Sequence, residues 1–255
     1  MRIASVVGGV TIGVLCLGGV PAFAQDGSPM TTKQPEKTKE KSYDQDKKKD
    51  KKESSDKINA GSVAPAFAAP DTDGKTHSLA EATKEGKIVV LQWFNAGCPW
   101  VKMHYGAKAN TFNDLHAKYA SKGVQFYAVA SNAPGTQGSG KDFNAKAKTD
   151  WKMPYPILLD ESGTIGRSYN AANTPLMVII GKDGKVAYYG AIDDASETDA
   201  PGKTNYVAKA LDEMLAGTNV TVPSTKPYGC SVKYAEKPMK EKTSPTEKTK
   251  DGEKK

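Results

Sequence analysis

Cysteine and histidine are scarce in this sequence of 255 residues, which contains three of each. The cysteines and histidines do not recur at the short spacings that metal ligands require, so we expect no metal site. The first cysteine, Cys16, lies in the apolar N-terminal segment. If that segment is removed, Cys98 and Cys230 are the only two cysteines, and an oxidising compartment would allow them to form a disulfide.

Long apolar runs are also nearly absent, because residues 3–20 form the only one. Arg2 precedes this run, and a small-x-small sequence ends at Ala24. This order is typical of a secretory signal peptide, so we predict a signal peptide at residues 1–24 and export to the periplasm or the outside of the cell. The alternative is an uncleaved anchor, since the run is nearly long enough to span a bilayer.

Apolar residues are almost missing from two further stretches, residues 25–57 and 236–255, which are rich in Lys and other polar residues. Such stretches cannot bury enough surface to offset the entropy cost of ordering, so we predict a disordered linker and a disordered tail. They carry much of the net charge of +7, and we expect no nucleic-acid partner. A solvated spacer is the first interpretation, and a weak contact with an anionic envelope component is the alternative.

Cys98 stands in an informative context. It follows a continuous apolar run at residues 88–94 and precedes a helical pattern, so we predict that it lies where a buried strand ends and a helix begins. Pro99 suits the first position of that helix. Free backbone N–H groups and the helix dipole favour a thiolate there, which is the reactive form of cysteine. The alternative is a small buried side chain without chemistry.

Residues 58–235 have a globular composition and alternate between strand and helix patterns. This order predicts one α/β domain with a central mixed sheet, and an Asp-Gly pair at 73–74 predicts an N-terminal hairpin. We expect strands at 64–67, 77–79, 88–94, 124–130, 154–159, 177–180 and 186–189, and helices at 80–85, 99–120, 141–148, 163–169 and 205–215.

Three motifs support a more specific interpretation: the hairpin at 61–79, the sequence Cys-Pro-Trp-Val at 98–101, and Thr-Pro at 174–175. With these motifs the sequence resembles thioredoxin-fold proteins of the redoxin branch, the AhpC/TSA peroxiredoxin-like family. The resemblance implies that Cys98 takes the place of the first cysteine of the thioredoxin Cys-x-x-Cys motif. It also implies that Pro175 is a cis proline that faces the cysteine. The substrate-binding residues that it implies are Thr174, Pro175, Pro99 and Trp100.

The sequence departs from the family's peroxidases at four positions. The resemblance would place a peroxidatic cysteine where Val101 stands, a Thr or Ser where Cys98 stands, and a proline where Phe94 stands. It would also place an arginine near Thr174, whereas Arg167 is the only arginine that follows the signal peptide. A thiol peroxidase is therefore the least favoured of the functions considered.

The sequence also differs from thioredoxins at the residue that would transfer a proton to or from the thiol. Gln92 occupies the place of the buried acid that serves as a base in thioredoxins. Proton transfer would then fall to water, or to Lys102 or His104. For His104 we favour a solvated side chain over one that faces the thiol.

A second cysteine follows the last helix. The Gly229-Cys230 sequence resembles a C-terminal element of a peroxiredoxin-like subgroup, which implies that Cys230 folds back and acts as a resolving cysteine for Cys98. The predicted function is thus an exported thiol–disulfide oxidoreductase. The alternative is a non-catalytic module with a structural Cys98–Cys230 disulfide and an envelope-binding role.

The expected partners follow from this chemistry. They are protein thiols or disulfides, or a small oxidant, together with a reducing partner protein. We expect no cofactor. A glycine-rich stretch at 135–142 nearly matches a phosphate-binding loop, but Asp142 stands where such a loop needs a Ser or Thr, so we interpret it as a surface loop.

Overall fold

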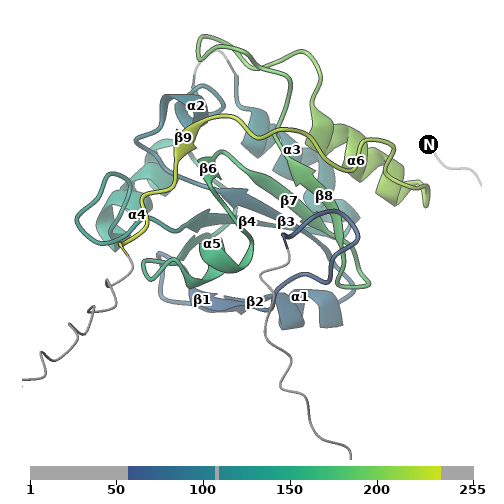
Figure 1. Ribbon diagram of the computed structural model, residues 1–255, viewed down its shortest axis with the longest axis horizontal. Coiled ribbons are helices and arrows are strands. Elements are labelled where there is room, and N and C mark those ends of the chain that lie inside the picture. Colours follow the sequence, from purple (N-terminus) through teal and green to yellow (C-terminus); the bar gives the residue numbers. More distant parts are fainter. Residues whose placement is uncertain (1–56, 107–108, 237–255) are drawn as a thin grey trace, which may run out of the picture. The chain divides into compact units, whose positions relative to one another are not determined.

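The computed structural model describes residues 57–106 and 109–236 (Figure 1). The predicted signal peptide, almost all of the predicted linker and almost all of the predicted tail lie outside the described residues. In chain order, the elements are β1 (Ala68–Pro70), β2 (Thr76–Ser78), α1 (Leu79–Lys84), β3 (Ile88–Trp93), α2 (Pro99–Lys102), α3 (Thr111–Tyr119), η1 (Ala120–Lys122), β4 (Val124–Ala130), α4 (Lys141–Asp150), β5 (Ile157–Leu159), α5 (Thr164–Ser168), β6 (Asn173–Thr174), β7 (Met177–Ile180), β8 (Val186–Gly190), α6 (Tyr206–Leu215) and β9 (Cys230–Ser231).

A five-stranded mixed sheet forms the centre of the domain, with strand order β5-β4-β3-β7-β8. The strands β3, β4 and β5 are parallel to one another, and β7 and β8 are antiparallel to their neighbours. This confirms the predicted thioredoxin-like α/β fold. Two small sheets are added to it: the N-terminal hairpin β1-β2, and the pair β6-β9, which joins segments far apart in the sequence.

Side chains of β3 alternate between two apolar cores, one on each face of the sheet. Ile88 and Val90 belong to the core that also contains residues of α3, α4 and α6. Val89 and Leu91 belong to the other core, which contains residues of α1, α5 and the N-terminal segment. Because both faces are covered, every residue of β3 is buried, which explains why this strand is apolar at every position except Gln92 rather than alternating between apolar and polar residues.

The structure corrects the helix that the sequence predicts after Cys98. Instead of one helix to residue 120, α2 ends at Lys102 and α3 begins at Thr111. A turn in which the N–H of Ala109 donates to the carbonyl of Gly106 separates them. Gly106 lies in this interval, and a glycine destabilises the interior of a helix. The buried side chains of His104 and Tyr105, just before it, form hydrogen bonds with Tyr228 and Gln92, and these contacts direct the chain away from a continuous helix. The first expected strand is also displaced, from 64–67 to β1 at Ala68–Pro70.

No helix in the described part of the chain is long and apolar enough to cross a membrane.

Candidate functional site

Cys98 lies at the junction that the sequence predicts, between β3 and α2. A turn leads into it, in which Asn95 Oδ1 accepts the N–H of Gly97 at 2.8 Å and the carbonyl of Asn95 accepts the N–H of Cys98 at 3.0 Å. Cys98 is the N-cap residue of α2, and Pro99 is the first helical residue. Because α2 has four residues, few peptide dipoles are aligned behind the thiol, and the expected contribution of a long helix dipole is not available.

The thiol of Cys98 has no exposed surface and donates to the carbonyl oxygen of Thr174 at 3.2 Å. The Thr174–Pro175 peptide bond is cis. Both residues are buried, and they connect β6 to β7 at the centre of the domain. The structure therefore brings Cys98 together with the Thr-Pro loop.

Cys230 lies in the same place. In the antiparallel pair β6-β9 it stands opposite Thr174, whose carbonyl accepts the Cys98 thiol. Burial raises the pKa of the Cys230 thiol to about 11, and the neighbouring Cys98 adds to this rise. Both cysteines are free thiols. Two residues far apart in the chain thus form one dithiol site, with a half-buried Cys230 beside a fully buried Cys98.

Gly229 allows the close approach of β9. Its φ angle of +111° is one that residues with a side chain rarely adopt. A Cβ atom at this position would overlap with the carbonyl oxygen of Thr174. The glycine before Cys230 is therefore required for the chain to pass against the Thr-Pro loop.

Residues 226–235, which we call the C-terminal strap, cross the domain beside α2 and β6 (Figure 1, yellow). Beyond Cys230 the strap is held by the Val232 N–H, which donates to the carbonyl of Ala172 at 3.0 Å, and by the Ala133 N–H, which donates to the carbonyl of Lys233 at 2.7 Å. The Tyr234 hydroxyl also donates to the carbonyl of Ala171 at 2.7 Å. This end of the strap is thus bonded to two separate loops.

Arg167 contributes to the same anchorage. Its guanidinium donates to the carbonyl of Ala235 at 2.7 Å and lies 4.4 Å from the centre of the Tyr234 ring. The only arginine that follows the predicted signal peptide is therefore engaged by the strap rather than by the thiol of Cys98.

Before Cys230, the strap is held by Tyr228. The Tyr228 hydroxyl donates to Asp193 Oδ1 at 2.6 Å and lies 3.1 Å from His104 Nε2. The Tyr228 ring packs on Trp100, with 4.8 Å between ring centres.

His104 is completely buried, so the prediction of a solvated side chain is wrong. The Nδ1 atom of His104 lies 3.1 Å from Thr111 Oγ1, and its Nε2 atom is hydrogen-bonded to the Tyr228 hydroxyl. Both nitrogens are thus engaged away from the Cys98 thiol. Burial lowers the pKa of His104 to about 4, although the nearby charge of Asp193 opposes this effect.

The other predicted residues lie in α2 and β3, the two elements that flank Cys98. Pro99 is exposed, Trp100 is half-buried against Tyr228, and Lys102 is exposed at the end of α2. Gln92 is buried within β3, where its Oε1 accepts the hydroxyl of Tyr105 at 2.8 Å. Sequence reasoning assigned no role to Tyr228 and interpreted the acidic loop that contains Asp193 as solvated, whereas Asp193 is buried. The place of Tyr228 two residues before the second cysteine was a signal for the tyrosine, and no sequence signal connected Asp193 with it.

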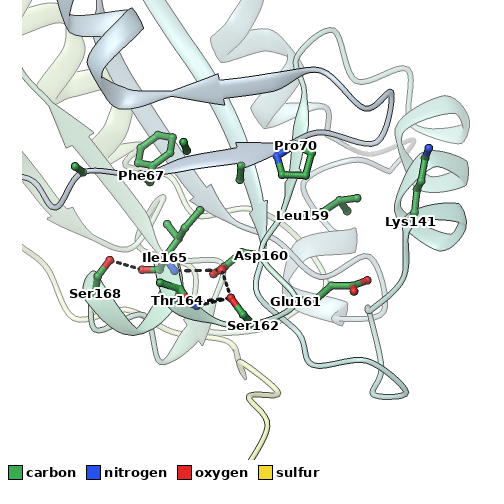
Figure 2. A pocket seen from close by; sticks show the side chains of 13 residues that line it. Phe67, Pro70, Lys141, Leu159, Asp160, Glu161, Ser162, Thr164, Ile165 and Ser168 are labelled. Carbon is green, nitrogen blue, oxygen red and sulfur yellow. Dashed lines mark hydrogen bonds between the residues drawn. The ribbon is translucent and has the colours of Figure 1, made fainter.

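A cavity of about 710 Å³ lies away from the thiols (Figure 2). It lies between β1, β5 and α5, and neither cysteine lines it. Its buried carboxylate, Asp160, accepts the N–H groups of Ile165 at 3.1 Å and Gly166 at 2.8 Å, and the hydroxyl of Ser131 at 2.6 Å. This carboxylate therefore supports the turn into α5. No group of three His, Cys, Asp or Glu residues within 57–106 and 109–236 could hold a metal ion.

The sequence matches the AhpC/TSA family over residues 60–189, which is half of the chain. The chain belongs to the AhpC/TSA family. A relative named thiol-disulfide oxidoreductase ResA, from Bacillus thuringiensis subsp. konkukian (strain 97-27), is 32% identical over 133 residues, which are 51% of this chain and 69% of the relative. A chloroplastic peroxiredoxin Q from Gentiana triflora is 32% identical over 117 residues, which are 44% of this chain and 46% of the relative.

Two solved structures have a similar fold. An uncharacterized conserved protein from Geobacillus kaustophilus superposes with a TM-score of 0.64 at 28% identity, over 71% of this chain and 95% of that one. A hypothetical protein from Sinorhizobium meliloti 1021 superposes with a TM-score of 0.62 at 23% identity, over 71% of this chain and 97% of that one, and shows the same fold.

Proposed function

We propose that this member of the AhpC/TSA family is a thiol–disulfide oxidoreductase in which Cys98 is the nucleophile and Cys230 is the resolving cysteine. The observation that carries the proposal is the shared position of the two thiols, since both lie beside Thr174. A relative that is named for thiol–disulfide exchange supports the same activity. Thr174, Pro175, Pro99 and Trp100 surround this site and would contact the substrate.

The reaction that fits this pair has two exchange steps. The Cys98 thiolate attacks one sulfur of a partner disulfide, forms a mixed disulfide and releases the partner's other sulfur as a thiolate. The Cys230 thiolate then attacks the Cys98 sulfur and releases the second partner thiolate. The dithiol becomes a Cys98–Cys230 disulfide, two electrons pass to the partner, and the two protons of the dithiol leave with the partner's thiols or with solvent. A reducing partner protein would return the pair to the dithiol.

Peroxide reduction is less well supported, although a peroxiredoxin Q is among the relatives. Val101 is a buried apolar residue where the family's peroxidatic cysteine would stand. Arg167 is bonded to the strap at Ala235 and stacks on Tyr234. The chain therefore lacks the groups that would activate a peroxide in the expected way.

A structural disulfide is the second candidate, and the complete burial of Cys98 favours it. The reduction potential separates the two functions. We would equilibrate the mature protein in graded thiol redox buffers and count free thiols by mass. A disulfide that opens between about −270 and −120 mV lies among oxidoreductases, whereas one that resists reduction below about −300 mV is structural.

Single-cysteine variants test the order of the two steps. When treated with a small aromatic disulfide, Cys230→Ser should accumulate a mixed disulfide between Cys98 and one half of the reagent, because the resolving thiol is missing. Cys98→Ser should not accumulate one at a comparable rate. Burial is the main cause of the raised pKa of Cys230, and it remains in this variant, so little Cys230 thiolate is present at pH 7. If Cys98→Ser reacts as fast as Cys230→Ser, the assigned roles are wrong.

We further propose that the protein is exported, with cleavage after Ala24. The N-terminal sequence supports this proposal, and the mass of the protein recovered from the periplasm or the medium tests it, since a mature chain should begin at Gln25.

A further inference from the structure

Between its two anchored ends, the strap bridges the dithiol site through residues 226–231. On one side, the residues just before the strap are held to β8, since the Tyr189 N–H donates to the carbonyl of Pro223 at 3.1 Å and the Thr225 N–H donates to the carbonyl of Tyr189 at 3.2 Å. On the other side, Val232 is bonded to Ala172. Both ends of the bridge are therefore held to the domain, and its middle carries Tyr228 and Cys230.

The hydroxyl of Tyr228 is part of a hydrogen-bond chain with one consistent direction. Thr111 donates its hydroxyl to His104 Nδ1, His104 Nε2–H donates to the Tyr228 oxygen, and the Tyr228 O–H donates to Asp193 Oδ1. This assignment requires a neutral His104, which agrees with its lowered pKa of about 4. Each group in the chain then has a partner.

Asp193 and Thr111, at the two ends of this hydrogen-bond chain, are themselves held in place. Asp193 is buried, and it accepts the Ala195 N–H through Oδ1 at 3.1 Å and the Gly202 N–H through Oδ2 at 2.9 Å. Thr111 is the first residue of α3. The Tyr228 hydroxyl is thus held between the start of a helix and a loop that two backbone donors define.

The ring of Tyr228 connects the two cysteines. It packs on Trp100, which lies in the short helix capped by Cys98, and it stands two residues before Cys230. Between Tyr228 and Cys230 there is only Gly229, whose backbone passes against Thr174. A displacement of Tyr228 would therefore move Cys230 relative to Cys98.

We propose that Tyr228 is a positioning residue for the dithiol reaction, which holds Cys230 beside Cys98 through the hydrogen-bond chain to His104 and Asp193 and through its contact with Trp100. This inference rests on the proposed function. A strap that is held in place before reaction loses less freedom when the disulfide forms, so the effective concentration of Cys230 at Cys98 is raised.

The test compares two tyrosines of the same strap. Tyr228→Phe removes the hydroxyl in the hydrogen-bond chain, and Tyr234→Phe, the matched control, removes a hydroxyl bonded to the Ala171 carbonyl. For wild type and both variants we would measure the equilibrium constant for the internal disulfide against dithiothreitol, counting thiols by mass. Tyr228→Phe should lower this constant about tenfold, which is about 30 mV for a two-electron couple. Tyr234→Phe should change it by less than about twofold, since its anchor lies beyond the bridge.

Each outcome bears on the proposal. An unchanged constant in Tyr228→Phe, or an equal shift in Tyr234→Phe, overturns the inference and leaves the proposed function intact. A wild-type protein that forms no Cys98–Cys230 disulfide overturns both. If Tyr228→Phe does not fold, Trp100→Leu removes the ring contact but keeps the hydroxyl, and it should shift the constant in the same direction; no shift in that variant contradicts the proposal.

Discussion

Burial limits access to the Cys98 thiol and lowers the pKa of the His104 side chain. Cys98 has no exposed surface, so a partner reaches its sulfur only when the segments around it move. His104 is equally buried, and the loss of solvation lowers its pKa to about 4 despite the charge of Asp193. A neutral imidazole accepts from Thr111 and donates to Tyr228 at once, which a protonated ring could not do.

The pKa of His104 predicts how stability depends on pH. The unfolded chain binds this proton near pH 6.5 and the folded chain only near pH 4, so the unfolded state holds more protons between these values. The contribution of His104 to the free energy of unfolding should therefore fall by about 3 kcal/mol as the pH is lowered from 7 to 4. Urea unfolding at a series of pH values measures this slope.

The control is His104→Gln, which does not titrate and keeps a donor near Tyr228. Its unfolding free energy should depend less on pH between 6.5 and 4.5 than that of the wild type. His116, whose pKa is also lowered by burial, is present in both proteins and cancels in the comparison. Equal slopes would assign the pH dependence to other groups.

Among the elements, we expect the strap and its strand β9 to control access to the Cys98 thiol. β9 pairs with β6, whose Thr174 carbonyl accepts the Cys98 thiol, and we therefore expect β9 to cover this thiol. The residues next to β9 in the strap are bonded to neighbouring loops. Reaction at Cys98 therefore requires local opening of this segment, whose free energy can be smaller than that of global unfolding.

Removal of the strap should expose Cys98. We expect that a chain of residues 25–225 reacts with iodoacetamide at Cys98 at least about tenfold faster than the Cys230→Ser variant of residues 25–255. Both chains have Cys98 as their single thiol, and only the second keeps the strap. A buried side chain reacts only through an open state, which removal of the strap should favour. Labelling is followed by mass at pH 7, and circular dichroism checks that the shortened domain is folded. Equal labelling rates would mean that the strap does not limit access.

The central strands could be predicted from the sequence because their signal is local. β4 was predicted at its observed bounds, and β3 to within one residue, because each is a short apolar run. β6 and β9 have two residues each and no such pattern. β6 and β9 form only because Thr174 and Cys230 pair with each other, and a local sequence pattern cannot predict a contact between positions so far apart.

The break between α2 and α3 was not predictable for a related reason. The residues that follow α2 keep an apolar character that a helix would also have. In the structure, however, Tyr105 is bonded to Gln92 and His104 to Tyr228, and these tertiary contacts direct the chain. For the same reason, the sequence could indicate His104 as a candidate for proton transfer but could not show that its Nε2 is hydrogen-bonded to Tyr228.

At the scale of the whole molecule, the described domain contains all the groups that the proposed chemistry uses. Both apolar cores consist of residues between Ile58 and Tyr234, and the two thiols and the Tyr228 hydrogen-bond chain lie in the same range. The charged segments that the sequence predicts at 25–57 and 236–255 supply no cysteine.

We therefore expect a chain of residues 57–236 to have the same reduction potential and the same melting temperature as the mature chain of residues 25–255. Lys-rich ends could act on the thiols only through long-range charge, which solution ions screen beyond about 8 Å at physiological ionic strength. The two chains should thus agree at 0.15 M salt (on the order of cellular ionic strength). They should differ, if at all, only at low salt, where a positive end would favour the thiolate. A shifted potential at physiological salt would show that the charged ends contact the domain, and an insoluble short chain would show that they are needed to keep it in solution.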